Sequence, residues 1–160
     1  IYALRVKLSD FLNDPLGHLV IDKIHEVYQI QTFKLQLWYD EGDLTPADLK
    51  SFIDKLSPDT FGINYDIGNS ASMGFNIEEE INAYGDRVLN VHVKDRITNG
   101  TTVPLGEGSA NFTEAFEQLH SVDYSGNYIL QTARAEDGNH AAVLKSYKSM
   151  VKGWIVNNES

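Results

Sequence analysis

The feature that most constrains the fold lies between residues 61 and 108, where two short apolar runs each end in polar side chains. The run FGINYD ends at Asp66, and the run VLNVHVKD carries His92 and Lys94 near its end. A stretch of helical character, residues 76–84, separates the two runs. Strands that alternate with helices form parallel sheets, whose strands end at a common edge. We therefore expect these three side chains to lie together at the edge where such sheets hold their ligands.

The same alternation continues along the whole chain. Period-two apolar patterns predict strands, and apolar residues three to four apart predict helices. The expected strands are 2–8, 33–39, 61–66, 88–94 and 128–132, and the expected helices are 14–29, 45–56, 76–84, 111–121 and 140–156. Thr45 and Asn76 are expected helix caps, and the glutamates at 78–80 suit the positive end of the helix that Asn76 begins. A βα unit repeated five times predicts the α/β class.

The number of units leaves two architectures open. Five βα units with parallel strands fit part of an eight-stranded (β/α)8 barrel, or a doubly wound open sheet. A complete barrel needs about 250 residues, whereas this chain has 160 and begins with Ile1. We expect one domain over residues 1–160 that forms the C-terminal part of a longer barrel. Because a partial barrel exposes sheet edges, a homodimer is one expected way of covering them.

Composition narrows the classes of function. The chain has 13 basic and 23 acidic residues, a formal charge of −10, and no cysteine. A surface this acidic repels a phosphate backbone, which argues against a nucleic-acid partner. No apolar run is long enough to cross a membrane, and without cysteine these residues have no disulfide or thiol chemistry. We expect a cytoplasmic protein with a small-molecule substrate and no membrane partner.

Four short sequence motifs suggest a family. YDIGN at 65–69, HVKDR at 92–96, PLGEG at 104–108 and ILQTAR at 129–134 resemble the sugar-phosphate isomerase/epimerase family. These are xylose-isomerase-like TIM barrels, whose superfamily also includes the type IV apurinic endonucleases. The resemblance implies the barrel fold, with about five of its βα units in this chain. It does not specify a sugar.

The resemblance also implies one divalent metal ion, Mn²⁺, Mg²⁺, Co²⁺ or Zn²⁺, at the mouth of the barrel. In this family a Glu, an Asp, a His and a second Glu from four successive strands hold the ion. Asp66 and His92 match the Asp and the His, with Asp95 close enough in sequence to orient the imidazole. Glu41 fits the first Glu, although another register places Trp38 there. An Asp in this sequence context is also a good helix or turn cap.

The fourth position departs from the family pattern. Gln131 stands where the well-characterised epimerases have the second Glu. An amide oxygen can ligate a metal but cannot take up a proton near neutral pH. The acid/base role then falls to Glu41 or to Glu107 of PLGEG, or the reaction needs one base only. A third alternative is a relative that binds without catalysis.

Substrate contacts follow from the same resemblance. Asn69 and Lys94 are expected to bind sugar hydroxyls, and Arg134 a phosphate or carboxylate in bidentate fashion. Lys94 has an alternative partner in Asp66 or Asp95, and Arg134 in Glu136 or Asp137.

Three functions remain as hypotheses. The first is a metal-dependent isomerase or epimerase of a sugar or sugar phosphate, which abstracts a proton next to a carbonyl. The second is a non-catalytic sugar-binding relative with a decayed metal site. The third, an endonuclease-like phosphodiesterase, ranks lowest, because only His92 is placed as a histidine ligand and the chain is acidic.

Overall fold

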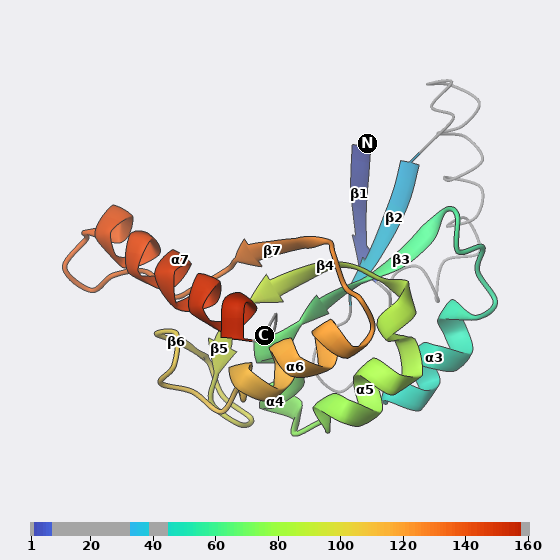
Figure 1. The fold of residues 1–160 in the computed structure, drawn as a ribbon, viewed down its shortest axis with the longest axis horizontal. Helices are drawn as coiled ribbons and strands as arrows, with labels where there is room; N and C mark the ends of the chain where they lie inside the picture. The colour runs from blue at the N-terminus through green and yellow to red at the C-terminus, as the bar shows by residue number, and fades with distance from the viewer. Residues whose placement is uncertain (1, 8–32, 39–44, 158–160) are drawn as a thin grey trace.

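The computed structural model describes residues 2–7, 33–38 and 45–157. Its main sheet has five parallel strands in chain order (Figure 1). These are β1 (Tyr2–Lys7), β2 (Phe33–Trp38), β3 (Phe61–Asp66), β4 (Val88–Val93) and β7 (Asn127–Leu130). All five expected strands are confirmed to within one or two residues. The expected helix at 14–29 and the candidate ligand Glu41 lie outside the described residues.

The order of the strands separates the two expected architectures. A doubly wound sheet reverses its order at a switch point, whereas here each strand pairs with the next one along the chain. The helices α3 (Pro46–Ile53), α5 (Ile77–Tyr84) and α6 (Phe112–Ser121) lie along one side of the sheet (Figure 1). A sheet wound in one direction with its helices on one side is a segment of a (β/α) barrel.

The two faces of the sheet differ in chemistry. The face toward the helices carries Ile63, Tyr65, Val91 and Val93, all fully buried. Residues one position along in each strand turn to the other face, and in β3 and β4 these are polar. They are Asn64, Asp66, Asn90 and His92. The Asn90 side-chain amide donates to Asn64 Oδ1 at 2.7 Å, so the inner face is polar and hydrogen-bonded where β3 and β4 meet.

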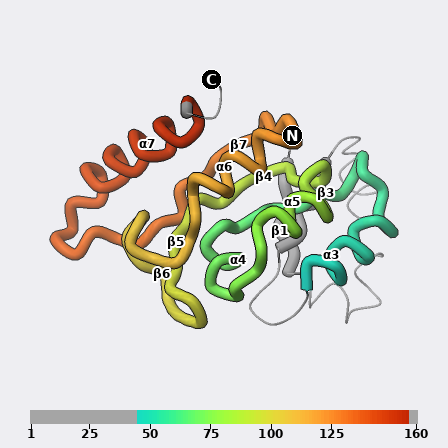
Figure 2. Tube along the Cα trace, turned by 60° about the horizontal axis from the view of Figure 1, so that its bottom comes forward, coloured from blue at the N-terminus to red at the C-terminus, as the bar shows by residue number. Residues whose placement is uncertain are grey.

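Local side-chain caps begin the helices where the sequence predicts. Thr45 caps α3 in a capping box with Asp48, and Asn76 and Asn111 cap α5 and α6. Helix α3 ends at Ile53, three residues before the expected end. Helix α7 (His140–Asn157) lies at the opposite end of the molecule from α3 in both views (Figures 1 and 2). None of the helices in the described part of the chain could span a membrane.

Three elements were not expected. A short helix, α4 (Ile67–Met73), follows β3 directly and ends at Gly74 with φ +70°. A 3-10 turn, η1 (Gly85–Arg87), leads into β4. The segment that follows β4 contains an antiparallel hairpin of β5 (Asp95–Arg96) and β6 (Thr102–Val103) beside α4. Helix α4 and this hairpin both stand at the C-terminal ends of β3 and β4.

Candidate functional site

The ends of β3 and β4 bring together Asp66 and His92, two of the three predicted ligands that the structure describes. Asp66 and His92 are partners in the parallel register. The Nδ1 atom of His92 lies 3.5 Å from Asp66 Oδ2. His92 is 4% exposed, so its imidazole is held by the surrounding protein. The expectation that these side chains meet at one edge of the sheet is confirmed.

Both oxygens of the Asp66 carboxylate have further partners. Lys94 Nζ donates to Oδ2 at 3.0 Å, and the backbone N–H of Asn69 donates to Oδ1 at 2.9 Å, which makes Asp66 the N-cap of α4. Burial acts against ionisation and is the largest single influence on the Asp66 pKa. The hydrogen bond from His92, the Lys94 charge and the bonds from Asn69 and Lys94 together outweigh it and lower the pKa. Asp66 is therefore an anion at neutral pH.

This lowered pKa predicts an acid-dependent stability term. Asp66 stabilises the fold above the carboxyl pKa of the unfolded chain, and this contribution is lost as the pH falls through its folded pKa. Urea unfolding of the wild type and Asp66→Asn between pH 7 and pH 3 is expected to show a stability difference that shrinks on acidification. In Lys94→Met the loss is expected to begin at higher pH, because the ammonium no longer favours the anion. If the stability difference between the wild type and Asp66→Asn does not change with pH, the lowered pKa of Asp66 is contradicted.

Asp95 has a different role from the expected one. Its carboxylate does not orient His92; it accepts the N–H groups of Gly106 and Gly108 at 2.8 Å and of Ala110 at 3.2 Å. The side chain is buried, and the segment 104–110 folds around it. A Cβ at Gly108 would collide with this carboxylate and lie 2.7 Å from the backbone oxygen of Arg96. Asp95 therefore fixes the segment that carries the exposed Glu107.

Arg96 is a residue that the sequence analysis passed over. Its Nη1 donates to Asn69 Oδ1 at 3.0 Å, and its Nε to the carbonyl of Gly100 at 3.0 Å. Arg96 thus ties the first turn of α4 to the β5–β6 hairpin. The Asn69 side chain, a predicted sugar contact, is engaged by Arg96 in this structure. Arg96 is the last residue of the motif HVKDR, and its place in that motif was the sequence feature that could have indicated its role.

Gln131 follows β7 at the expected edge. Its N–H donates to the carbonyl of Val93 at 3.1 Å. Ile129, two positions earlier, is the register partner of His92, so Gln131 shares that strand face and lies nearer the mouth. Gln131 and Arg134 are both exposed. Across the described ranges, no ion pair joins Arg134 to Glu136 or Asp137.

The predicted set of metal ligands lies only partly within the described residues. Within residues 45–156, whose side chains the structure describes, no three His, Cys, Asp or Glu residues gather around one point. Asp66 and His92 are two of the candidate donors, and the other two are the amide of Gln131 and Glu41, which lies outside the described ranges. Carboxylate, imidazole and amide oxygen are donors that suit Mn²⁺, Mg²⁺, Co²⁺ or Zn²⁺. The residues present are thus compatible with a divalent ion.

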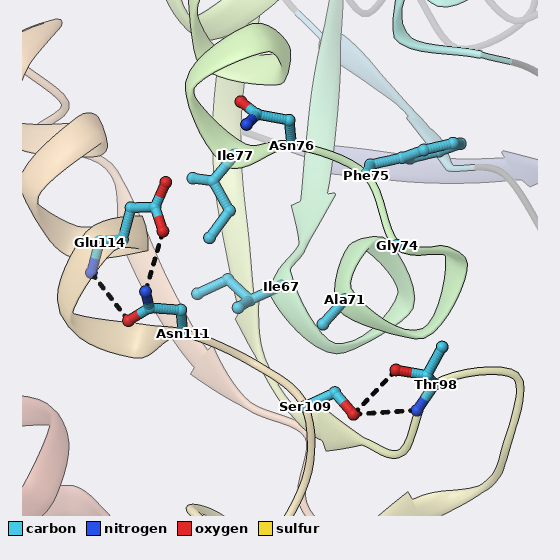
Figure 3. A pocket seen from close by; sticks show the side chains of 10 residues that line it. All are labelled: Ile67, Ala71, Gly74, Phe75, Asn76, Ile77, Thr98, Ser109, Asn111 and Glu114. Carbon is cyan, nitrogen blue, oxygen red and sulfur yellow. Dashed lines mark hydrogen bonds between the residues drawn. The ribbon is translucent and has the colours of Figure 1, made fainter.

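A separate pocket of about 300 Å³ lies between α4, the start of α5 and the start of α6 (Figure 3). Its polar groups bond one another: Thr98 with Ser109, and Asn111 with Glu114. Neither Asp66 nor His92 lines it. This pocket is therefore distinct from the candidate site on the inner face of the sheet.

A singly wound parallel sheet with a carboxylate, an imidazole and an ammonium group at the strand ends defines a (β/α)-barrel protein with a polar mouth. The sequence pattern of the family described as xylose isomerase-like TIM barrel matches residues 28–152. The chain belongs to this family. The predicted family and the partial barrel fold are thus both confirmed.

Similar proteins include sugar enzymes. L-ribulose-5-phosphate 3-epimerase UlaE of Salmonella paratyphi A is 31% identical over 93 residues, covering 58% of this chain and 33% of the epimerase. Inosose dehydratase of Geobacillus kaustophilus is 25% identical over 176 aligned positions, covering 96% of this chain and 56% of the dehydratase. The chain thus spans about half or less of the length of these relatives. They support an isomerase- and epimerase-like enzyme family.

A solved structure confirms the fold. The IolI protein, solved with a bound zinc atom, matches with a TM-score of 0.66 at 18% identity, covering 89% of this chain and 55% of the IolI chain. At this identity the match concerns the fold alone.

Proposed function

We propose that the protein is an isomerase or epimerase of a sugar or sugar phosphate that uses one divalent metal ion. The observation that carries the proposal is the pairing of Asp66 with His92 at the ends of neighbouring strands, 3.5 Å apart on the polar inner face. An anionic carboxylate beside a buried imidazole is a donor pair for a divalent ion. The epimerase and dehydratase relatives, and the zinc of IolI, support the same reading.

The proposed ligands are Glu41, Asp66, His92 and Gln131. When bound, the ion polarises the carbonyl and hydroxyl oxygens of the sugar. The Asn69 N–H and Lys94 fix the orientation of the Asp66 carboxylate, so that it meets a cation without reorganisation. Lys94 is mostly buried, and its remaining N–H groups are proposed to bind a sugar hydroxyl.

The proton chemistry is proposed to depend on Glu41 or Glu107. A carboxylate removes the proton from the carbon next to the carbonyl and returns it to the neighbouring carbon. A single base suffices for such an isomerisation, in which the proton is removed and returned on one face of the sugar while the hydroxyl proton passes to the former carbonyl oxygen. Epimerisation returns the proton to the same carbon from the opposite face and needs a second acid, for which Glu41 and Glu107 together are the candidates. Gln131 cannot serve as a second base, so the chain favours the one-base reaction. Arg134 and Asn69 are proposed as further substrate contacts, and the relatives' sugar chemistry makes the cytoplasm the proposed compartment.

A substitution at Gln131 tests the metal assignment. Gln131→Glu adds the charge that the family pattern has at this position. We expect Mn²⁺ to bind about tenfold more tightly, because an anion replaces a neutral amide oxygen, as measured by isothermal titration calorimetry. Gln131→Asn, which shortens the side chain without adding charge, is the control. If neither the wild type nor Gln131→Glu binds an ion, the metal-dependent proposal is wrong for this chain.

One observation favours the second candidate, a sugar-binding relative without catalysis. Lys94 already neutralises Asp66, and an amide stands in place of the second acid. This candidate predicts sugar binding that is indifferent to metal and to chelators. Isomerisation of any ketose or ketose phosphate by the metal-loaded protein, lost on chelation, would exclude it.

A further inference from the structure

Glu80 is a buried acid that the proposed mechanism does not use. It is 0% exposed although it lies in the first turn of α5. Its carboxylate accepts hydrogen bonds from three hydroxyl groups. Tyr84 donates to Oε1 at 2.7 Å, Tyr65 donates to Oε2 at 3.2 Å, and Ser70 also donates to Oε2. Burial of a carboxylate is unfavourable unless such donors stabilise it, so the cluster has a specific arrangement.

Two of these hydroxyls lie on either side of Asp66 in the chain. Tyr65 is the residue directly before Asp66 at the end of β3, and Ser70 lies one turn after it in α4. Tyr84 belongs to the same helix as Glu80 and so holds the carboxylate within α5. The Glu80 carboxylate therefore joins α5 to both sides of the β3–α4 junction, where Asp66 is the last strand residue and the helix cap.

Helix α4 packs closely against the end of β4, so a small displacement of α4 would alter the β3–α4 junction. A Cβ at Gly68 would lie 2.7 Å from the backbone oxygen of Lys94, so α4 rests directly on the end of β4. A shift of α4 would change the position of Asp66 relative to His92 and Lys94.

We propose that Glu80 is a positioning residue that, through Tyr65 and Ser70, holds Asp66 at the junction of β3 and α4. Its effect on metal binding rests on the proposed function, whereas its effect on Asp66 does not. The hydrogen bond from the Asn69 N–H to Asp66 Oδ1 reports the placement of Asp66 without any ligand.

Amide hydrogen exchange measured by NMR tests the positioning. Ser70→Ala and Tyr65→Phe each remove one hydroxyl that links Glu80 to the junction. Tyr84→Phe removes one hydroxyl from the same carboxylate, donated by a residue of α5 itself, and is the matched control. We expect Asn69 to exchange about fivefold faster in the first two variants, relative to Leu119 in α6, and to be unchanged in Tyr84→Phe. Dividing the exchange rate of Asn69 by that of Leu119 corrects for any loss of stability that affects the whole fold.

Titration of the same proteins with Mn²⁺ gives the second measurement. We expect affinity to fall about fivefold in Ser70→Ala and Tyr65→Phe and to be kept in Tyr84→Phe. If the wild type binds no Mn²⁺, the proposed function fails, and the exchange ratios still decide the role of Glu80. The inference is overturned if Asn69 exchange is unchanged in Ser70→Ala, or if all three variants alter the ratio equally.

Discussion

Replacement of Asp66 by asparagine is expected to lower the affinity for a divalent ion by about tenfold, because a neutral amide oxygen replaces an anionic ligand, the reverse of the change in Gln131→Glu. The fold is expected to survive. An asparagine side-chain oxygen still accepts the Asn69 N–H, and asparagine is as good an N-cap as aspartate. What is lost is the anion that Lys94 and His92 face. Calorimetric titration with Mn²⁺, beside thermal shift with and without the ion, measures both quantities.

Matched variants separate the ligand from the cap. His92→Ala removes a ligand outright and is expected to lower the affinity by at least about 100-fold, while the cap bond from the Asn69 N–H to Asp66 Oδ1 stays in place. Asp66→Ala should lose the ion and also about 1 kcal/mol of stability, since alanine cannot cap the helix. Asp59→Asn, at an exposed acid, should leave the affinity unchanged. Retention of full affinity in Asp66→Asn would exclude Asp66 as a ligand.

Replacement of Asp95 by alanine is expected to destabilise the protein by about 3 kcal/mol, because three backbone N–H groups lose their acceptor at once. For a chain of this size the loss corresponds to a fall in melting temperature of roughly 10 °C. Urea unfolding followed by circular dichroism measures the free energy directly. Asp95→Asn, which keeps one acceptor oxygen, is expected to lose less.

A glycine pair provides an independent check on this assignment. Gly108→Ala is expected to destabilise the protein, because the new Cβ meets the Asp95 carboxylate and a backbone oxygen. Gly153→Ala, in α7 with open space around the new atom, is expected to be neutral or to stabilise by up to about 1 kcal/mol. Equal effects at the two positions would show that Asp95 does not fix the segment 104–110.

The sequence by itself determined the features that depend on neighbours a few residues away. The sequence indicated the caps at Thr45 and Asn76, and these side chains, like that of Asn111, accept the backbone N–H of the residue three positions on. The strands followed from apolar alternation. Asp66 and His92 could be placed at one edge because parallel strands end together. The single domain over residues 1–160 and the metal, catalytic and substrate-binding roles of all the candidate residues stay predictions.

Only the tertiary structure decided how the acids are used. The sequence suggested that Asp95 orients His92, yet its carboxylate oxygens accept hydrogen bonds from backbone N–H groups 11 to 15 residues away. The sequence indicated Glu80 as an acid that suits the positive end of a helix, yet in the structure its carboxylate is buried and accepts hydrogen bonds from Tyr65 and Ser70, 15 and 10 residues away. A carboxylate can be stabilised equally by water, a helix terminus, a cation or hydroxyl donors. Which of these it meets depends on how the elements pack, and local sequence patterns carry no information about that.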